Sequence, residues 1–165
     1  MKRLGGVPLI DHVQDGEYVP GDPSALSVPR STELDTWKFV LKECDLAAAH
    51  LPEVVSSEDG VYRASKWAAY ALKSRAALFA ASVAKYWNKA PLAGEAVTQK
   101  LIGMDASEAD YFYGECISAS EAIINNSGKS LYKPNPASKE EAIENYKKLF
   151  LTDNNEEVIF AKAYL

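Results

Sequence analysis

The chain has 165 residues, of which 47% are hydrophobic and 25% charged, proportions typical of one globular domain over residues 1–165. The formal net charge is −5 and basic residues form no run, which argues against a nucleic-acid partner. No stretch of 18 apolar residues occurs, which excludes a membrane-spanning helix.

Residues 1–30 are expected to form an irregular loop that lies against a helical body. Met1 and Lys2 precede glycines instead of an apolar run, so we expect any export signal upstream of this chain. Proline removes a backbone donor and glycine weakens regular structure. These residues are concentrated here as Gly5, Gly6, Pro8, Gly16, Pro20, Gly21, Pro23 and Pro29.

A first helical hairpin is predicted over residues 31–87. Ser31 or Thr32 supplies a hydroxyl that accepts a hydrogen bond from the first turn of a helix, and Pro52 ends this helix. Its apolar residues recur at steps of three and four, as on one helical face. They are Leu34, Trp37, Leu41, Cys44, Ala48 and Leu51.

The second helix of this hairpin is predicted from Ser65 to Trp87 and is rich in alanine, the best helix former. Its larger core residues are expected to be Leu72, Phe79, Val83 and Tyr86. Arg75 lies on the same stretch, and we expect it to pair with Asp45 or Glu43 of the first helix.

A second helical hairpin is predicted over residues 105–151, after a loop of residues 88–104. Asp105 is expected to cap a helix over residues 106–127. Gly128 follows this helix and favours its termination, because glycine adopts a left-handed backbone conformation easily.

The last helix is predicted to begin at Ser138 and to run to about Leu151, because Ser138 and Glu141 form a capping-box pattern. Residues 157–161 are apolar and β-prone and predict a short extended segment. The fold class predicted from these elements is all-α, with stacked helical hairpins.

No catalytic motif or metal-ligand spacing is present, so we predict no enzyme activity and no cofactor or metal. Asp11 and His12 are adjacent but lack a partnered nucleophile, and we interpret them as a solvated loop pair. Cys44 and Cys116 occupy apolar helix positions, which predicts two buried thiols, although the sequence leaves a disulfide open.

Exposed aromatic side chains are the remaining candidates for a ligand site, because the apolar faces of sugars stack on such rings. Trp87 and Asn88 begin the loop after the second helix, and Tyr18 lies in the first loop; these three are candidate glycan-binding residues. Packing against the next hairpin is the competing interpretation of Trp87. Trp37 and Trp67 fall on apolar helix faces and are expected to pack in the core.

Four segments in a fixed order carry a resemblance to a known family. They are residues 3–10 (RLGGVPLI), 29–32 (PRST) with 45–52 (DLAAAHLP), 62–79, and 145–150 (NYKKLF) with 155–161 (NEEVIFA). Together they resemble the SusD/RagB family of outer-membrane nutrient-binding lipoproteins over nearly the whole chain. Family members are several times longer, so the resemblance implies that this chain is part of a larger protein.

The resemblance implies tetratricopeptide-like hairpins and a protein that binds oligosaccharides or other nutrients without cutting them. It also implies an outward-facing place on the outer membrane beside a TonB-dependent, SusC-like transporter. The implied lipid anchor is a cysteine upstream of this chain, which neither Cys44 nor Cys116 matches, so the chain itself is expected to be soluble.

Much of the glycan-contacting surface is also expected outside this chain, so no binding residue is carried over from the family. The motif residues are expected to be architectural: Gly5, Gly6, Pro8, Arg30, Arg63, Tyr146 and Phe150. The chain departs from the family motif at Ser65, where threonine is usual, and at Trp67, where small residues are common.

Two other interpretations stay open. One is a helical-hairpin adaptor whose concave face binds a protein partner, which should be a stable monomer with capped ends. Part of a receptor should instead expose apolar surface and self-associate. The other is an α-helical enzyme, which a glycan hydrolysis assay would test.

Overall fold

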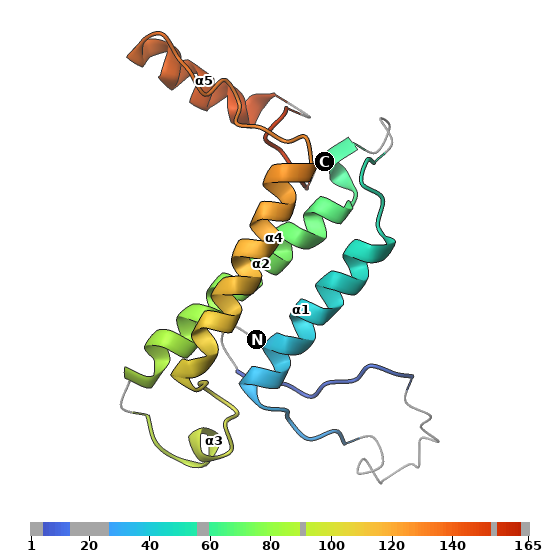
Figure 1. The fold of residues 1–165 in the computed structure, drawn as a ribbon, viewed down its shortest axis with the longest axis vertical. Helices are drawn as coiled ribbons and strands as arrows, with labels where there is room; N and C mark the ends of the chain where they lie inside the picture. The colour runs from blue at the N-terminus through green and yellow to red at the C-terminus, as the bar shows by residue number, and fades with distance from the viewer. Residues whose placement is uncertain (1–4, 14–26, 56–59, 90–91, 153–154, 163–165) are drawn as a thin grey trace. The chain divides into compact units, whose positions relative to one another are not determined.

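The computed structural model describes residues 5–13, 27–55, 60–89, 92–152 and 155–162. These ranges contain helices and no β-strand (Figure 1). The long helices are α1 (Glu33–His50), α2 (Lys66–Tyr86), α4 (Ala109–Asn126) and α5 (Lys139–Leu151). The short ones are η2 (Gly60–Tyr62), η3 (Trp87–Lys89), α3 (Glu95–Thr98) and η4 (Ala106–Glu108). No helix in the described ranges is long and apolar enough to cross a membrane.

The chain divides into two compact units, and each unit is built from segments that are distant in the sequence. Unit 1 holds Met1–Glu43 and Ala76–Gly114, and unit 2 holds Cys44–Arg75 and Glu115–Leu165. The helices α1, α2 and α4 contribute residues to both units.

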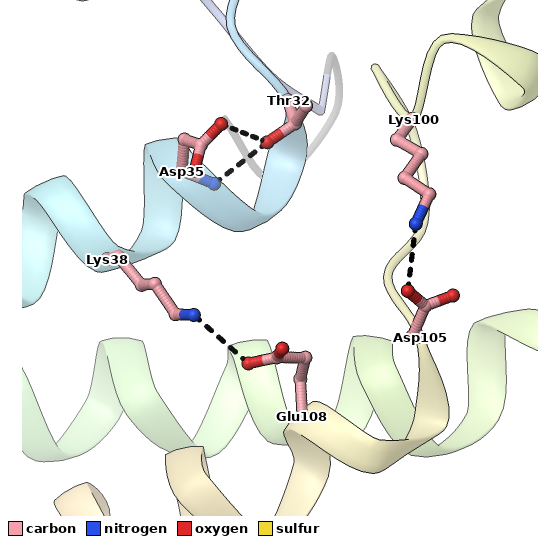
Figure 2. A network of polar contacts seen from close by, with 6 residues as sticks. All are labelled: Thr32, Asp35, Lys38, Lys100, Asp105 and Glu108. Atoms are coloured by element: carbon pink, nitrogen blue, oxygen red, sulfur yellow. Dashed lines mark hydrogen bonds and ion pairs between the residues drawn. The ribbon is translucent and has the colours of Figure 1, made fainter.

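The start of α1 agrees with the sequence prediction, and Thr32 is the residue that caps it. The backbone N–H of Asp35 donates to Thr32 Oγ1 at 3.0 Å, and the Thr32 hydroxyl donates to the Asp35 carboxylate at 2.6 Å (Figure 2). This hydroxyl satisfies one of the backbone donors that the first helical turn leaves unpaired. The Asp35 carboxylate also lies at the positive end of the helix dipole.

The core of unit 1 combines small side chains of α2 with aromatic side chains of α1, α2 and α4. Trp37 of α1 is 3% exposed, and its ring centroid lies 5.5 Å from that of Phe79 on α2. Phe112 of α4 is fully buried. The fully buried alanines of α2, which leave room for these rings, are Ala77, Ala80, Ala81 and Ala84.

Two large residues that the sequence placed in the core of α2 are exposed instead. Leu72 is 58% exposed and Tyr86 is 52% exposed. The buried face of α2 consists mainly of alanines, whose small side chains allow close packing, and it continues through Ala69 and Lys73. Leu72 precedes Lys73 by one residue, so it projects about 100° away from this face.

Lys73, and not Arg75, is the cation that pairs with Asp45 in unit 2. Lys73 Nζ lies 2.8 Å from the Asp45 carboxylate of α1 and 2.6 Å from the Glu115 carboxylate of α4. The prediction for Arg75 was wrong because Arg75 is exposed, and two residues along an α-helix turn its side chain about 200° away from Lys73. Lys73 therefore connects three helices of unit 2 through two carboxylates.

The N-terminal segment of residues 5–7 lies between the start of α1 and the chain that follows α3. The Gly6 N–H donates to the Leu101 carbonyl at 2.7 Å, and the Ser31 N–H donates to the Val7 carbonyl at 3.1 Å. A Cβ atom on Gly6 would collide with the Ser31 carbonyl oxygen, so the close approach requires glycine. This part of the predicted loop lies against the helices, as the sequence indicated.

The predicted start of the second hairpin needs two corrections. The loop after α2 contains the short helix α3, which the sequence did not predict. The 3₁₀ turn η4 precedes α4, and the Asp105 side chain makes no capping hydrogen bond there. The Asp105 carboxylate instead accepts a hydrogen bond from Lys100 Nζ at 2.9 Å, which removes it from the helix N-terminus.

Helix α5 begins with the predicted capping box. The Glu141 N–H donates to Ser138 Oγ at 3.1 Å, and the Glu141 carboxylate accepts from the Ala137 N–H at 2.7 Å. No residue of α5 is buried. The predicted extended segment forms no strand in its described part. The Ala161 N–H donates to the Val61 carbonyl at 2.9 Å, and the Val158 N–H donates to the nearby Asn155 carbonyl at 3.2 Å.

Candidate functional site

Of the three candidate ligand-binding residues, Trp87 is the one whose side chain lies in the described part of the structure. Trp87 is the first residue of η3, and it is 40% exposed. Asn88 lies in the same turn, but its side chain is outside the described part of the structure. Tyr18 lies outside the described residues altogether.

Trp87 lines a hollow of about 210 Å³ in unit 1, which we call the Trp87 hollow. Of its lining residues, Met104 is 4% exposed, whereas Leu92 is 44% exposed. The lining residues come from the chain between the end of α2 and the start of α4. They are Trp87, Leu92, Val97, Lys100, Ile102, Gly103, Met104 and Asp105.

The wall of the Trp87 hollow is the segment that follows α3. This segment leaves the helix through a sharp turn, in which Lys100 has a φ of 54° and Gly103 a φ of 79°. A positive φ is rare for residues with a side chain, so the turn is held by contacts outside it. One such contact is the hydrogen bond from the Glu33 N–H to the Lys100 carbonyl, at 3.0 Å.

One ion pair belongs to the lining of the hollow, and a second pair, outside the lining, joins α1 to η4. Lys100 Nζ lies 2.9 Å from the Asp105 carboxylate, and Lys38 of α1 lies 3.2 Å from the Glu108 carboxylate (Figure 2). The hydrogen bond to Asp105 raises the pKa of Lys100. Because the Lys100–Asp105 pair is largely exposed, it offers both a donor and an acceptor to a ligand hydroxyl.

Unit 2 has two further hollows, and both include Glu53 and Trp67. Their volumes are about 340 and 510 Å³. Trp67 is 6% exposed, so it presents little of its ring to either hollow, in agreement with its predicted packing role. Lys66 covers this ring at 5.4 Å and pairs with Glu53 at 2.7 Å. Trp87 is therefore the tryptophan that offers an open aromatic surface.

The residues of the family motif fall into two groups in the structure. Gly5 and Gly6 are buried against neighbouring backbone, and Arg30 Nε donates to the Gly6 carbonyl at 2.8 Å. Tyr146 and Phe150 lie on α5, 67% and 71% exposed, and stack edge to face with ring centroids 5.2 Å apart. The two other motif residues, Pro8 and Arg63, are exposed.

The groups considered for catalysis or metal binding stay apart in the described structure. His12 and Asp11 form an exposed pair at 2.8 Å, and the hydrogen bond to His12 lowers the pKa of Asp11. Cys44 is buried and Cys116 half-buried, and the two form no disulfide. Within the described ranges, no three His, Cys, Asp or Glu side chains gather as possible metal ligands.

Apart from Trp87, sequence reasoning missed the residues of the hollow, including Lys100, Gly103 and Asp105. They belong to a stretch predicted as a plain loop, and Asp105 was assigned to a helix cap. The available signal was Gly103 near the end of the loop of residues 88–104, because an isolated glycine often marks a close backbone approach.

No protein-family model matches the sequence, and no curated protein matches it significantly. Among solved structures, the chain is similar to a SusD-like protein from Bacteroides fragilis NCTC 9343, with a TM-score of 0.63 and 25% sequence identity. The similarity covers 99% of this chain and 24% of that protein's chain, so the chain spans about a quarter of the length of this solved protein. The fold therefore agrees with the resemblance that the sequence motifs indicated: the chain has a SusD-like fold, with an all-α, tetratricopeptide-like architecture.

Proposed function

We propose that this chain is mainly the helical scaffold of a non-catalytic, glycan-binding component of an outer-membrane uptake complex. The observation that carries the proposal is the SusD-like fold, which extends over 99% of the chain. The partner in this proposal is a TonB-dependent, SusC-like transporter, and the full-length protein is held outside the outer membrane by a lipid anchor. The ligand is an oligosaccharide or another nutrient.

Within the scaffold, the Trp87 hollow is the place where a sugar would bind. The exposed part of the indole offers an apolar face for the C–H groups of a sugar ring. Lys100 donates and Asp105 accepts hydrogen bonds at the rim, which suits ring hydroxyls. The volume of about 210 Å³ is below the roughly 300 Å³ of pockets for drug-sized ligands, so the hollow suits one sugar ring of a longer chain.

The test is a calorimetric titration of the chain with a panel of neutral and acidic oligosaccharides. For a ligand that binds, Trp87→Ala should weaken binding about fivefold to tenfold, because an aromatic stacking contact contributes roughly 1 kcal/mol. Tyr86→Ala is the matched control, since Tyr86 is the adjacent exposed aromatic residue and does not line the hollow. Equal binding by both variants would reject the Trp87 hollow as the ligand site.

The same samples test the non-catalytic part of the proposal. Mass spectrometry of the oligosaccharides after incubation should show no cleaved product. Release of shorter sugars by the wild-type chain would contradict the proposal and favour the enzyme interpretation.

A protein-binding adaptor is the second candidate function, and α5 is the surface through which it would bind; part of a receptor is expected to expose such an apolar surface as well. Its apolar residues are uncovered: Ile143 is 48% exposed and Leu151 is 82% exposed, beside Tyr146 and Phe150. Such an apolar face on a helix is typical of protein-interaction surfaces. Co-purification with a SusC-like transporter distinguishes the two candidates, because the receptor proposal requires that partner and the adaptor proposal does not.

A further inference from the structure

Glu33 is a buried carboxylate whose position in the first turn of α1 does not explain its burial. Its residue is 6% exposed, although an acidic residue at a helix N-terminus normally faces water. Its carboxylate accepts two hydrogen bonds, one from Trp37 Nε1 at 3.2 Å and one from the Gly103 N–H at 2.6 Å. The second bond joins residues 70 positions apart, so it connects α1 to the wall of the Trp87 hollow.

Gly103 in turn lies directly against the indole of Trp87. A Cβ atom built on Gly103 would lie 2.5 Å from Trp87 Cδ1 and 3.0 Å from Trp87 Nε1, so the indole edge rests on the bare backbone. The φ of Gly103 is +79°, a conformation that side-chain-bearing residues rarely adopt. The position of the Gly103 backbone therefore fixes how far the Trp87 ring can move towards this wall.

The wall itself is tethered at three nearby positions in unit 1. The Glu33 N–H binds the Lys100 carbonyl, the Gly6 N–H binds the Leu101 carbonyl, and the Glu33 carboxylate binds the Gly103 N–H. Of the three tethers, the last is the one made by a side chain and the one next to the indole. It can therefore be altered by substitution without changing the backbone of α1.

We infer that Glu33 is a positioning residue for the Trp87 hollow, acting through the Gly103 backbone on the orientation of the Trp87 indole. The inference rests on the proposed function only in naming the hollow a ligand site. The positioning itself is measured without any ligand, as the accessibility of Trp87 to solvent.

Acrylamide quenching of tryptophan fluorescence measures this accessibility. Trp37 and Trp67 are 3% and 6% exposed, whereas Trp87 is 40% exposed, so Trp87 dominates the quenching. The same measurement on Trp87→Phe, alone and combined with each Glu33 substitution, gives the background of the two buried rings, because Glu33 also binds the Trp37 indole. Gly103→Ala should raise the Trp87 quenching constant by up to about 2.5-fold, because a displaced indole moves from 40% towards full exposure.

Glu33→Gln should raise the quenching constant in the same direction but less, because the amide keeps one acceptor while its NH₂ group faces a donor. Gly128→Ala is the matched control: its φ of +68° is similar to that of Gly103, but no atom lies within 4 Å of its added Cβ. Far-UV circular dichroism checks that each variant is folded. If Glu33→Gln is unfolded, Glu33→Asp, whose shorter side chain cannot span both donors, replaces it.

The inference is supported if Gly103→Ala and the folded Glu33 variant both raise quenching while Gly128→Ala does not. It is overturned if the folded Glu33 variant quenches like wild type, or if Gly103→Ala and Gly128→Ala behave alike. For an oligosaccharide that binds, both site variants should also weaken binding about tenfold, equivalent to 1.4 kcal/mol. Unchanged sugar binding by Trp87→Ala would reject the proposed ligand site and leave the quenching result to decide the positioning role.

Discussion

Replacement of Lys73 by methionine tests how far a buried cation stabilises unit 2. The Lys73 side chain is 9% exposed and lies between the carboxylates of Asp45 and Glu115, at 2.8 and 2.6 Å. Methionine keeps the unbranched, apolar stem of the side chain and removes the charge. The two carboxylates then lose their shared cation.

We expect Lys73→Met to lower the free energy of unfolding by about 2 kcal/mol at neutral pH. A charge-assisted hydrogen bond contributes about 1.5–3 kcal/mol when it is protected from water. The Glu115 side chain is 30% exposed, so its bond to Lys73 should contribute most of this free energy. The Asp45 side chain is 51% exposed, so solvent screening reduces the contribution of its bond.

The assay is urea unfolding followed by far-UV circular dichroism. Lys38→Met is the control, because Lys38 is 44% exposed in its pair with Glu108 and should contribute less than about 1 kcal/mol. Equal destabilisation by the two substitutions would contradict the reasoning, because burial would then add nothing to the ion pair.

The effect of Lys73 should also depend on pH in one direction. Burial disfavours the charged amine, but the hydrogen bonds and charges of Asp45 and Glu115 outweigh it and raise the pKa of Lys73. The stabilisation is therefore complete below the ordinary lysine pKa of about 10.4 and is lost as the pH rises through the folded-state pKa. The difference between wild type and Lys73→Met should shrink over that alkaline range, and a difference that grows there would contradict this assignment.

Three further predictions concern backbone packing, helix capping and the exposed face of α5. Gly6→Ala should destabilise the chain by at least about 2 kcal/mol in urea unfolding, because its Cβ would meet the Ser31 and Thr32 backbone. Gly114→Ala in α4 is the control and should be neutral or stabilising by up to about 1 kcal/mol. Equal effects of the two substitutions would refute the close approach at Gly6. Ser138→Ala should reduce the helical circular dichroism signal, because loss of a cap costs about 1 kcal/mol and no buried residue of α5 compensates for that loss. Ser138→Asp keeps a capping acceptor and should retain the signal. The double variant Tyr146→Ser, Phe150→Ser should leave the free energy of unfolding within about 1 kcal/mol of wild type, since both rings are exposed, and should bind less of a hydrophobic dye. A large loss of stability would show instead that the two rings pack in a core.

The sequence predicted the helices whose signals are local. The Thr32 hydroxyl and the apolar steps through Trp37, Leu41 and Cys44 define α1 and its buried face, because capping and helical periodicity depend only on near neighbours. The capping box at Ser138 placed α5 for the same reason.

The rotation of α2 could not be predicted in the same way. Alanines occur on nearly every side of this helix, so the contrast between its apolar and polar faces is weak, and Leu72 suggested the wrong face. The same error assigned the ion pair to Arg75 and not to Lys73.

The Trp87 hollow shows a different limit of sequence reasoning. Trp87 was identified as an exposed aromatic side chain because it follows directly on a helix end. Its surroundings were missed because the Gly103 wall is held by Glu33, 70 positions earlier in the chain. A contact over that separation leaves no periodic or local pattern in the sequence.

The hydrogen bond between Gly6 and Leu101 has a consequence for the order in which the chain folds. It closes a loop of about 95 residues, and loop closure of that length costs on the order of 4 kcal/mol in chain entropy. Such a contact forms late, after the helices in between have shortened the path between its ends. During synthesis the Gly-Gly-Val segment must therefore stay undocked until residue 101 has left the ribosome.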